Sequence, residues 1–131
     1  RNSWEGLAFE RVCFEHIKQI KQALGIAGVS TLIYSWRVKD DPIHGDGAQI
    51  DMIIDRSDQV VNLCEMKFST KEYAIEKSDD DNLRHKVGRF DQMQKSRKAI
   101  HLTFITPFGV KQNMYQYVVQ NVVTAEDLFK E

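Results

Sequence analysis

Apolar residues recur along two segments of this chain with the roughly 3.6-residue period of an amphipathic helix. In segment 3–24 the apolar stripe consists of Phe9, Cys13, Ile17, Ile20 and Leu24, extended by Leu7 and Phe14. In segment 80–98 it consists of Leu83, Val87, Phe90 and Met93. Acidic residues lie near the start of the second segment and basic residues near its end, as the helix macrodipole favours. We therefore expect two helices, each with one face against a core.

Short segments rich in β-branched and apolar residues predict strands. They are 32–38, 47–55, 60–68 and 100–106, with a further apolar, extended segment at 118–123. Turn-like residues separate the second strand from the third, so these two are expected to form a hairpin. If Asp51 pairs with Glu65, the connecting loop has about five residues, which is usual for hairpins. Residues 124–127 resemble a capping motif for a final short helix.

The order of these elements indicates the fold class. A helix is followed by three strands, a second helix and a fourth strand. This order predicts an α/β domain with a mixed four- to five-stranded sheet flanked by helices. Residues 1–131 are expected to form one domain, because a chain of this length buries a substantial core as a single unit.

Composition excludes several classes of protein. A hydrophobic content of 42% and a charged content of 28% are those of an ordinary globular protein. No apolar run approaches the roughly 18 to 20 residues of a transmembrane helix, and no signal peptide is recognisable. Cys13 and Cys64 lack metal-ligand spacing and are expected to be buried free thiols. We therefore expect a cytoplasmic protein with no membrane association and, because the chain starts at Arg1, a piece of a longer protein.

Charge is balanced over the whole chain but not along it. The net charge of −1 gives no support to nucleic-acid binding. Segment 84–98 is nevertheless basic, and its basic residues are Arg84, His85, Lys86, Arg89, Lys95, Arg97 and Lys98. Such a local surface favours contact with phosphate. We assign Lys86 to substrate binding, with snorkelling to solvent as the alternative. For other members, Arg89 included, a solvated helix face is the more frequent explanation.

Charged side chains interrupt the two apolar strands of the expected hairpin. Asp51 lies in the first strand, and Glu65 and Lys67 lie in the second, where alternation puts both on the same face. Glu10 falls between two apolar groups of the first helix rather than on its polar face. A salt bridge across an exposed sheet face is one explanation for the strand residues, and a helix-edge ion pair is one for Glu10. A divalent metal with a scissile phosphate accounts for all of them together.

With a metal and a phosphate, each residue type has a distinct task. Asp51 and Glu65 supply the carboxylate oxygens that Mg²⁺ or Mn²⁺ prefers, and the metal lowers the pKa of a bound water and offsets charge on the leaving oxygen. Lys67 orients the attacking water or stabilises the transition state. Glu10 adds a ligand or positions water. Gln49 shares the face of Asp51 and contacts either substrate or a neighbouring loop.

These residues resemble the motif of the PD-(D/E)xK nuclease superfamily, which has the restriction-endonuclease-like fold. That motif has an acidic residue on one strand, matched by Asp51, and Asp or Glu, any residue and Lys on the next, matched by residues 65–67. A glutamate common on the first helix of the superfamily is matched by Glu10. Ile50 stands where a proline often precedes the first acidic residue. The resemblance implies Mg²⁺-dependent hydrolysis of phosphodiester bonds in DNA.

Longer stretches resemble one group of this superfamily, the C-terminal nuclease-like domain of bacterial and archaeal AAA-type ATPases. This resemblance covers nearly the whole chain and rests on residues 4–10, 47–51, 65–68 and 123–129. It implies an ATPase module before Arg1 in the same full-length chain. The sequence has no phosphate-binding glycine loop, so ATP is not expected to bind to this domain.

The expected function is therefore metal-dependent hydrolysis of DNA by a domain attached to an ATPase. The alternative is a catalytically silent, nuclease-derived module that binds DNA or protein or mediates oligomerisation. A solvent-open cleft with ordered metal favours the enzyme, whereas a site filled by its own side chains, or by the tail after Gly109, favours the module. A toxin-like or defence role shares the same chemistry. The oligomeric state is open, with a homodimer as one alternative because many nucleases of this fold cut both strands as dimers.

Overall fold

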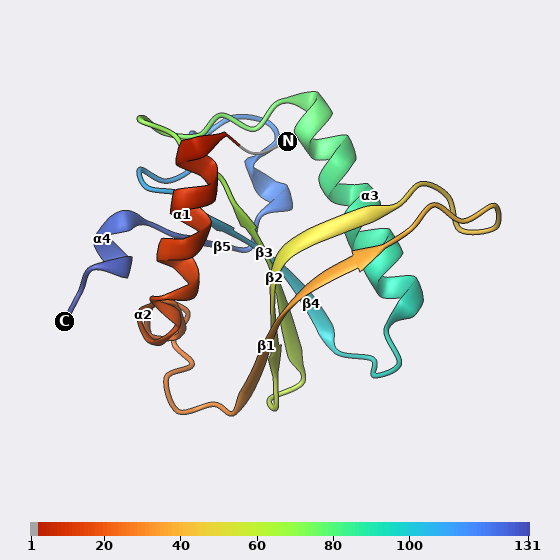
Figure 1. Ribbon diagram of the computed structural model, residues 1–131, viewed down its shortest axis with the longest axis horizontal. Helices are drawn as coiled ribbons and strands as arrows, with labels where there is room; N and C mark the ends of the chain where they lie inside the picture. The colour runs from red at the N-terminus through yellow and green to blue at the C-terminus, as the bar shows by residue number, and fades with distance from the viewer. Residues whose placement is uncertain (1–2) are drawn as a thin grey trace.

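The hairpin expected between the two acidic strands is present and contributes two neighbouring strands to a five-stranded sheet (Figure 1). The computed structural model describes residues 3–131, so the ATPase module expected before Arg1 lies outside the described residues. The strands are β1 (Thr31–Val38), β2 (Ala48–Arg56), β3 (Val60–Met66), β4 (Ala99–Ile105) and β5 (Asn121–Val123), in that spatial order. Strands β1 to β3 pair antiparallel and β3 to β5 pair parallel, so the sheet is mixed, as predicted.

Helices cover both faces of the sheet (Figure 1). They are α1 (Trp4–Phe14), α2 (Ile17–Ala23) and α4 (Ala125–Leu128) on one face, and α3 (Lys77–Met93) on the other. Adjacent residues of β2 point to opposite faces and enter different cores. Ile54 packs in the core that contains Cys13, whereas Ile53 packs in the core that contains Leu83. This is the α/β fold class that the sequence predicts.

The first helical segment consists of two helices rather than one. α1 ends at Phe14 and α2 begins at Ile17, and between them the backbone of His16 leaves the helical region (φ −127°, ψ 34°). The apolar stripe continues across this break, so periodicity did not reveal it. Leu7 and Phe14, which the sequence analysis placed in the stripe, are exposed.

The second helix begins and ends earlier than predicted. It starts at Lys77 because Glu76 and Asp79 form a reciprocal capping box. It ends at Met93, which is exposed rather than buried as expected. The basic residues of 94–98 therefore lie beyond the helix, and its last turn contains none. The expected match between basic residues and the helix macrodipole was wrong at this end.

Lys98 connects the segment after α3 to the end of β2 that is remote from Asp51. Its ammonium donates to Oδ1 of Asp55 at 2.7 Å and to the carbonyl oxygen of Arg56 at 2.6 Å. The side chain of Lys98 is 16% exposed. Lys98 therefore still packs against the sheet although it lies beyond the end of α3.

The C-terminal part of the chain is less extended than predicted. Of residues 118–123 only the last three form a strand, β5, and a 3₁₀ helix (Gln116–Val118) precedes it. The final short helix is confirmed, because Thr124 and Asp127 form the reciprocal bonds of a capping box at the start of α4. No helix in residues 3–131 has the length and apolar character needed to cross a membrane.

Candidate functional site

A β-bulge in β2 sets the direction of Asp51. The register between β1 and β2 shifts by one residue between Tyr34 and Trp36, so that Asp51 and Met52 together face the single residue Ser35. The hydroxyl of Ser35 donates to the carbonyl oxygen of Asp51 at 3.0 Å. Met52 is buried in the core with α1, whereas the side chain of Asp51 lines a cleft. Bulges re-aim side chains in this way and are frequent beside active sites.

Asp51 lies beside Glu65, as the expected hairpin requires. Met52 pairs with Cys64, and continuing that register by one residue brings Asp51 opposite Glu65. Oδ2 of Asp51 accepts a hydrogen bond of 3.1 Å from the backbone N–H of Met66, the residue after Glu65. The two carboxylates of the motif are therefore held close together on adjacent strands.

Glu65 is a buried carboxylate with only one of its oxygens bonded. The residue is 1% exposed, and its Oε1 accepts a hydrogen bond of 2.9 Å from Nζ of Lys86 on α3. Oε2 is buried and has no hydrogen-bond partner within the described residues. Burial raises the pKa of Glu65, Lys86 opposes that shift and Asp51 adds to it. Because an unbonded buried oxygen is costly, Oε2 is an atom that a bound cation would satisfy.

Lys67 approaches this pair of carboxylates from the end of β3. It lines the same cleft, and its charge lowers the pKa of Glu65, which places its ammonium near that carboxylate. Lys67 takes part in none of the ion pairs formed within residues 3–131. Its charge is therefore available to an anionic ligand in the cleft.

Glu10 approaches Asp51 from α1. Burial, together with the negative charge of Asp51, raises the pKa of Glu10. Across the described part of the chain, no three Asp, Glu, His or Cys side chains are grouped so that they could hold a metal ion. The structure therefore brings Asp51 and Glu65 together but does not group Glu10 with them as a third ligand.

A cleft of about 490 Å³ opens over the two carboxylates. Its lining consists of Gly47, Ala48, Gln49, Asp51, Glu65, Met66, Lys67, Asn82 and Lys86. The cleft thus contains every predicted site residue except Glu10. Asn82, which the sequence analysis missed, precedes Lys86 by one helical turn on α3. The i, i+4 spacing from Asn82 to Lys86, which puts both on one face of the helix, could have revealed it.

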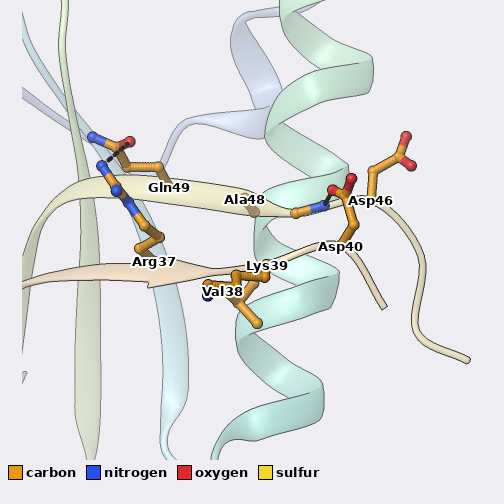
Figure 2. A pocket seen from close by; sticks show the side chains of 8 residues that line it. Arg37, Val38, Lys39, Asp40, Asp46, Ala48 and Gln49 are labelled. Carbon is orange, nitrogen blue, oxygen red and sulfur yellow. Dashed lines mark hydrogen bonds between the residues drawn. The ribbon is translucent and has the colours of Figure 1, made fainter. Parts of the chain in front are cut away.

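Gln49 lies between this cleft and a second pocket at the end of the β1–β2 hairpin (Figure 2). The second pocket, of about 740 Å³, is lined by Arg37, Val38, Lys39, Asp40, Asp46, Gly47, Ala48 and Gln49. Arg37 donates a hydrogen bond of 3.1 Å to Oε1 of Gln49, and Figure 2 shows the two side chains meeting. The side chain of Gln49 is therefore positioned by Arg37 of the neighbouring strand β1, and it lines both the cleft and the second pocket.

α3 holds the 40–47 loop that leads into β2. Arg89 donates to the carbonyl oxygens of Gly45, at 3.1 Å, and of Asp46, and Nε2 of His85 lies 3.0 Å from the same Asp46 oxygen. Arg89 is 2% exposed, so its expected place on a solvated helix face was wrong. The physical reason is that a buried guanidinium needs several acceptors, and the backbone carbonyl oxygens of Gly45, Asp46 and Lys39 supply them.

The basic residues of 84–98 do not form one continuous basic surface, because several of them pair with carboxylates. Lys86 is paired with Glu65, and Arg84 is paired with Asp80 at 2.9 Å. Lys95 and Arg97 are exposed beyond the end of α3. Only part of the predicted basic surface is therefore free to attract phosphate.

Comparisons with known proteins extend the description of the fold. No protein-family model matches the chain, and no curated protein sequence matches it. It is similar in structure to the crystal structure of a protein of unknown function, AF1548, with a TM-score of 0.59 and 12% sequence identity. The likeness covers 89% of this chain and 64% of that one. At this identity it shows a shared fold.

Proposed function

We propose that this chain is a metal-dependent phosphodiesterase of the PD-(D/E)xK class that acts on DNA. One observation carries the proposal: Glu65 is buried beside Asp51 at an open cleft, and one of its oxygens has no hydrogen-bond partner among residues 3–131. A protein that only needed a stable sheet would gain nothing from two neighbouring carboxylates, one of them buried and half-bonded.

The donor set fits a magnesium ion. Mg²⁺ is usually bound by one or two carboxylates, with water and substrate phosphate completing its coordination. Asp51 and Glu65 meet that count, so Glu10 is not required as a ligand. When bound, the ion would supply charge neutralisation at the phosphate and a lowered pKa for a bound water.

The other cleft residues have tasks that follow from their chemistry. Lys67, which has no ion-pair partner in residues 3–131, would donate to a phosphate oxygen and stabilise the charge that develops in the transition state. Gln49 and Asn82 would donate amide hydrogen bonds to substrate, since both line the cleft. Glu10, with a raised pKa beside Asp51, would accept a proton from a water near that residue.

The setting of this activity is part of the same proposal. We infer that the domain serves an ATPase module in the same full-length chain, in the cytoplasm. Support for the ATPase comes from the sequence resemblance. Cys13 and Cys64 are free and buried, which is consistent with a reducing compartment. A homodimer stays a prediction.

The test is cleavage of end-labelled single-stranded, duplex and branched DNA with Mg²⁺ or Mn²⁺. Wild type is compared with Lys67→Ala and Asp51→Asn, and Lys18→Ala on the exposed face of α2 is the matched control. We expect metal-dependent cleavage by wild type and the control, and a loss of at least about 100-fold in both site variants. Equal cleavage by all four proteins would point to a contaminating nuclease and contradict the assignment.

A second candidate function is a binding module without catalysis. It is favoured by the ion pair between Lys86 and Glu65, because the site is then partly filled by its own cation. Such a module would bind DNA equally well with and without divalent metal, and Asp51→Asn would leave that binding unchanged. Metal-dependent cleavage lost in Asp51→Asn excludes this candidate.

A further inference from the structure

We propose that Lys86 is a displaceable counter-ion: its ammonium compensates Glu65 while no metal is bound, and a divalent cation releases it into the cleft. The inference rests on the proposed function, since it concerns the same carboxylates. It adds a property that the motif does not contain, namely that metal affinity is set by competition with a lysine on α3.

The first argument is the position of the ammonium. Nζ of Lys86 lies 2.9 Å from Oε1 of Glu65, with the two side chains 17% and 2% exposed. A cation bound to the same carboxylate would occupy the space next to this ammonium, and like charges at such a distance repel strongly where little water screens them. A divalent cation at Glu65 therefore weakens the hold of that carboxylate on the ammonium of Lys86, and Lys86 in turn weakens the binding of the cation.

The second argument is that the ion pair leaves one oxygen of the Glu65 carboxylate without a hydrogen-bond partner. Lys86 bonds Oε1 only, and Oε2 is buried without a partner in residues 3–131. An ammonium is a point charge with three donors, whereas a carboxylate has two oxygens that need partners. A divalent cation that binds between Glu65 and Asp51 would compensate more of the negative charge than one ammonium does.

The third argument is that the cleft offers the ammonium of Lys86 an alternative position. Its side chain forms part of the cleft wall, with Asn82 one turn earlier on α3. Lysine has a flexible four-carbon stem, so its ammonium can leave Glu65 while the helix stays in place. In the cleft it would meet the phosphate of a bound substrate. Lys86 thus has two successive roles. It sets the affinity of Glu65 for the metal, and after the metal has bound it contacts the phosphate of the substrate.

Lys98 provides a matched comparison. It too is a largely buried lysine paired with a carboxylate on the sheet, at 2.7 Å from Asp55 and 16% exposed. Lys98 does not line the cleft. Both pairs contribute to packing in a similar way, but only Lys86 competes with a cation at the acidic site. The two lysines are expected to respond differently to metal and similarly to denaturation.

The first experiment measures Mn²⁺ binding by calorimetry to the whole 131-residue chain without DNA. We expect Lys86→Met to bind Mn²⁺ about tenfold more tightly than wild type, a coupling of ordinary size, and Lys98→Met to bind as wild type does. A residue with a merely structural role would weaken metal binding when removed. Equal or weaker binding by Lys86→Met, with clear binding by wild type, would overturn the inference and leave the proposed function intact. No binding by either protein would overturn both.

A second experiment avoids substitution, in case Lys86→Met does not fold. Wild-type lysines are acetylated briefly with and without saturating Mg²⁺, and the modified sites are quantified by mass spectrometry. We expect the labelling of Lys86 to rise several-fold with Mg²⁺ while Lys98 stays protected. If Mg²⁺ is bound and the labelling of Lys86 stays the same or falls, the ammonium has not left Glu65 and the inference fails.

Discussion

The backbone N–H of Met66 donates a hydrogen bond of 3.1 Å to Oδ2 of Asp51. This bond joins the bulged part of β2 to the end of β3 and fixes one carboxylate relative to the other. Asp51 and Glu65 both line the cleft, and Oε2 of Glu65 has no partner within the described residues. The acidic site is thus built into the hairpin itself.

The pKa of Glu10 predicts a pH-dependent gain in stability for Glu10→Gln. Burial and Asp51 raise this pKa above its ordinary value of 4.5, so the native state holds a proton on Glu10 more tightly than the unfolded state. Ionisation of Glu10 therefore lowers the free energy of unfolding. This loss of stability is absent at pH values below the pKa of Glu10 in the unfolded state, and it is complete at pH values above the pKa in the folded state. Without metal, we expect Glu10→Gln to be more stable than wild type at about pH 7, by about 0.5 kcal/mol or less.

Urea denaturation of both proteins at about pH 7 and about pH 3.5 checks this prediction. The difference should vanish in acid, because Glu10 is then protonated in both states. If Glu10→Gln differed from wild type by the same free energy of unfolding at both pH values, the substitution would act through packing and not through the charge of Glu10.

Arg89 is predicted to stabilise the 40–47 loop and the wall of the cleft. Arg89→Met removes the donors that serve Gly45 and Asp46 and should cost about 2 to 4 kcal/mol. Amide hydrogen exchange should accelerate in the loop more than in β4. Arg97→Met, at an exposed position after α3, is the control and should stay within about 0.5 kcal/mol of wild type. Unchanged exchange in the loop would show that the guanidinium does not hold it.

Gly47 is predicted to tolerate no side chain. A Cβ at this position would lie 2.7 Å from the carbonyl oxygen of Val38 and 3.1 Å from Oδ1 of Asp40. Gly47→Ala should therefore destabilise the protein by about 1 to 3 kcal/mol and shift the rim of the cleft. At Gly88 on α3 a Cβ meets no atom within 4 Å, so Gly88→Ala should stabilise by up to about 1 kcal/mol. Thermal unfolding of the two variants side by side checks both signs, and equal effects would contradict the crowding argument.

The two cysteines are predicted to be unreactive in the native protein. Both are buried, and burial raises the pKa of Cys13 to about 12 and that of Cys64 further. The thiolate, which is the reactive form, is therefore scarce at about pH 8. Ellman's reagent should modify neither thiol until the protein unfolds, with the rate tracking the unfolded fraction along a urea titration. Rapid modification of one thiol in the native state would show a local opening near α1 or β3.

Local patterns along the chain were enough to predict most of the secondary structure. The strands, the capping of α4 and the pairing of Asp51 with Glu65 follow from alternation, capping chemistry and hairpin register, which depend on residues close in sequence. The errors arose where the apolar pattern carries no signal. The helix break at His16 and the early end of α3 are not marked by any change in the apolar stripe.

The sequence by itself determined the α/β class, the mixed sheet and the placement of Asp51 and Glu65 on neighbouring strands, with Lys67 directly after the second, because these depend on local periodicity and element order. Only the tertiary structure decided how the carboxylates are used. The bulge that turns Asp51 toward the cleft requires β1 beside β2. The partner of Glu65 is 21 residues away on α3, and the contact of Arg89 with Asp46 spans 43 residues. Such contacts form when the sheet and helices pack, and no spacing along the chain specifies them.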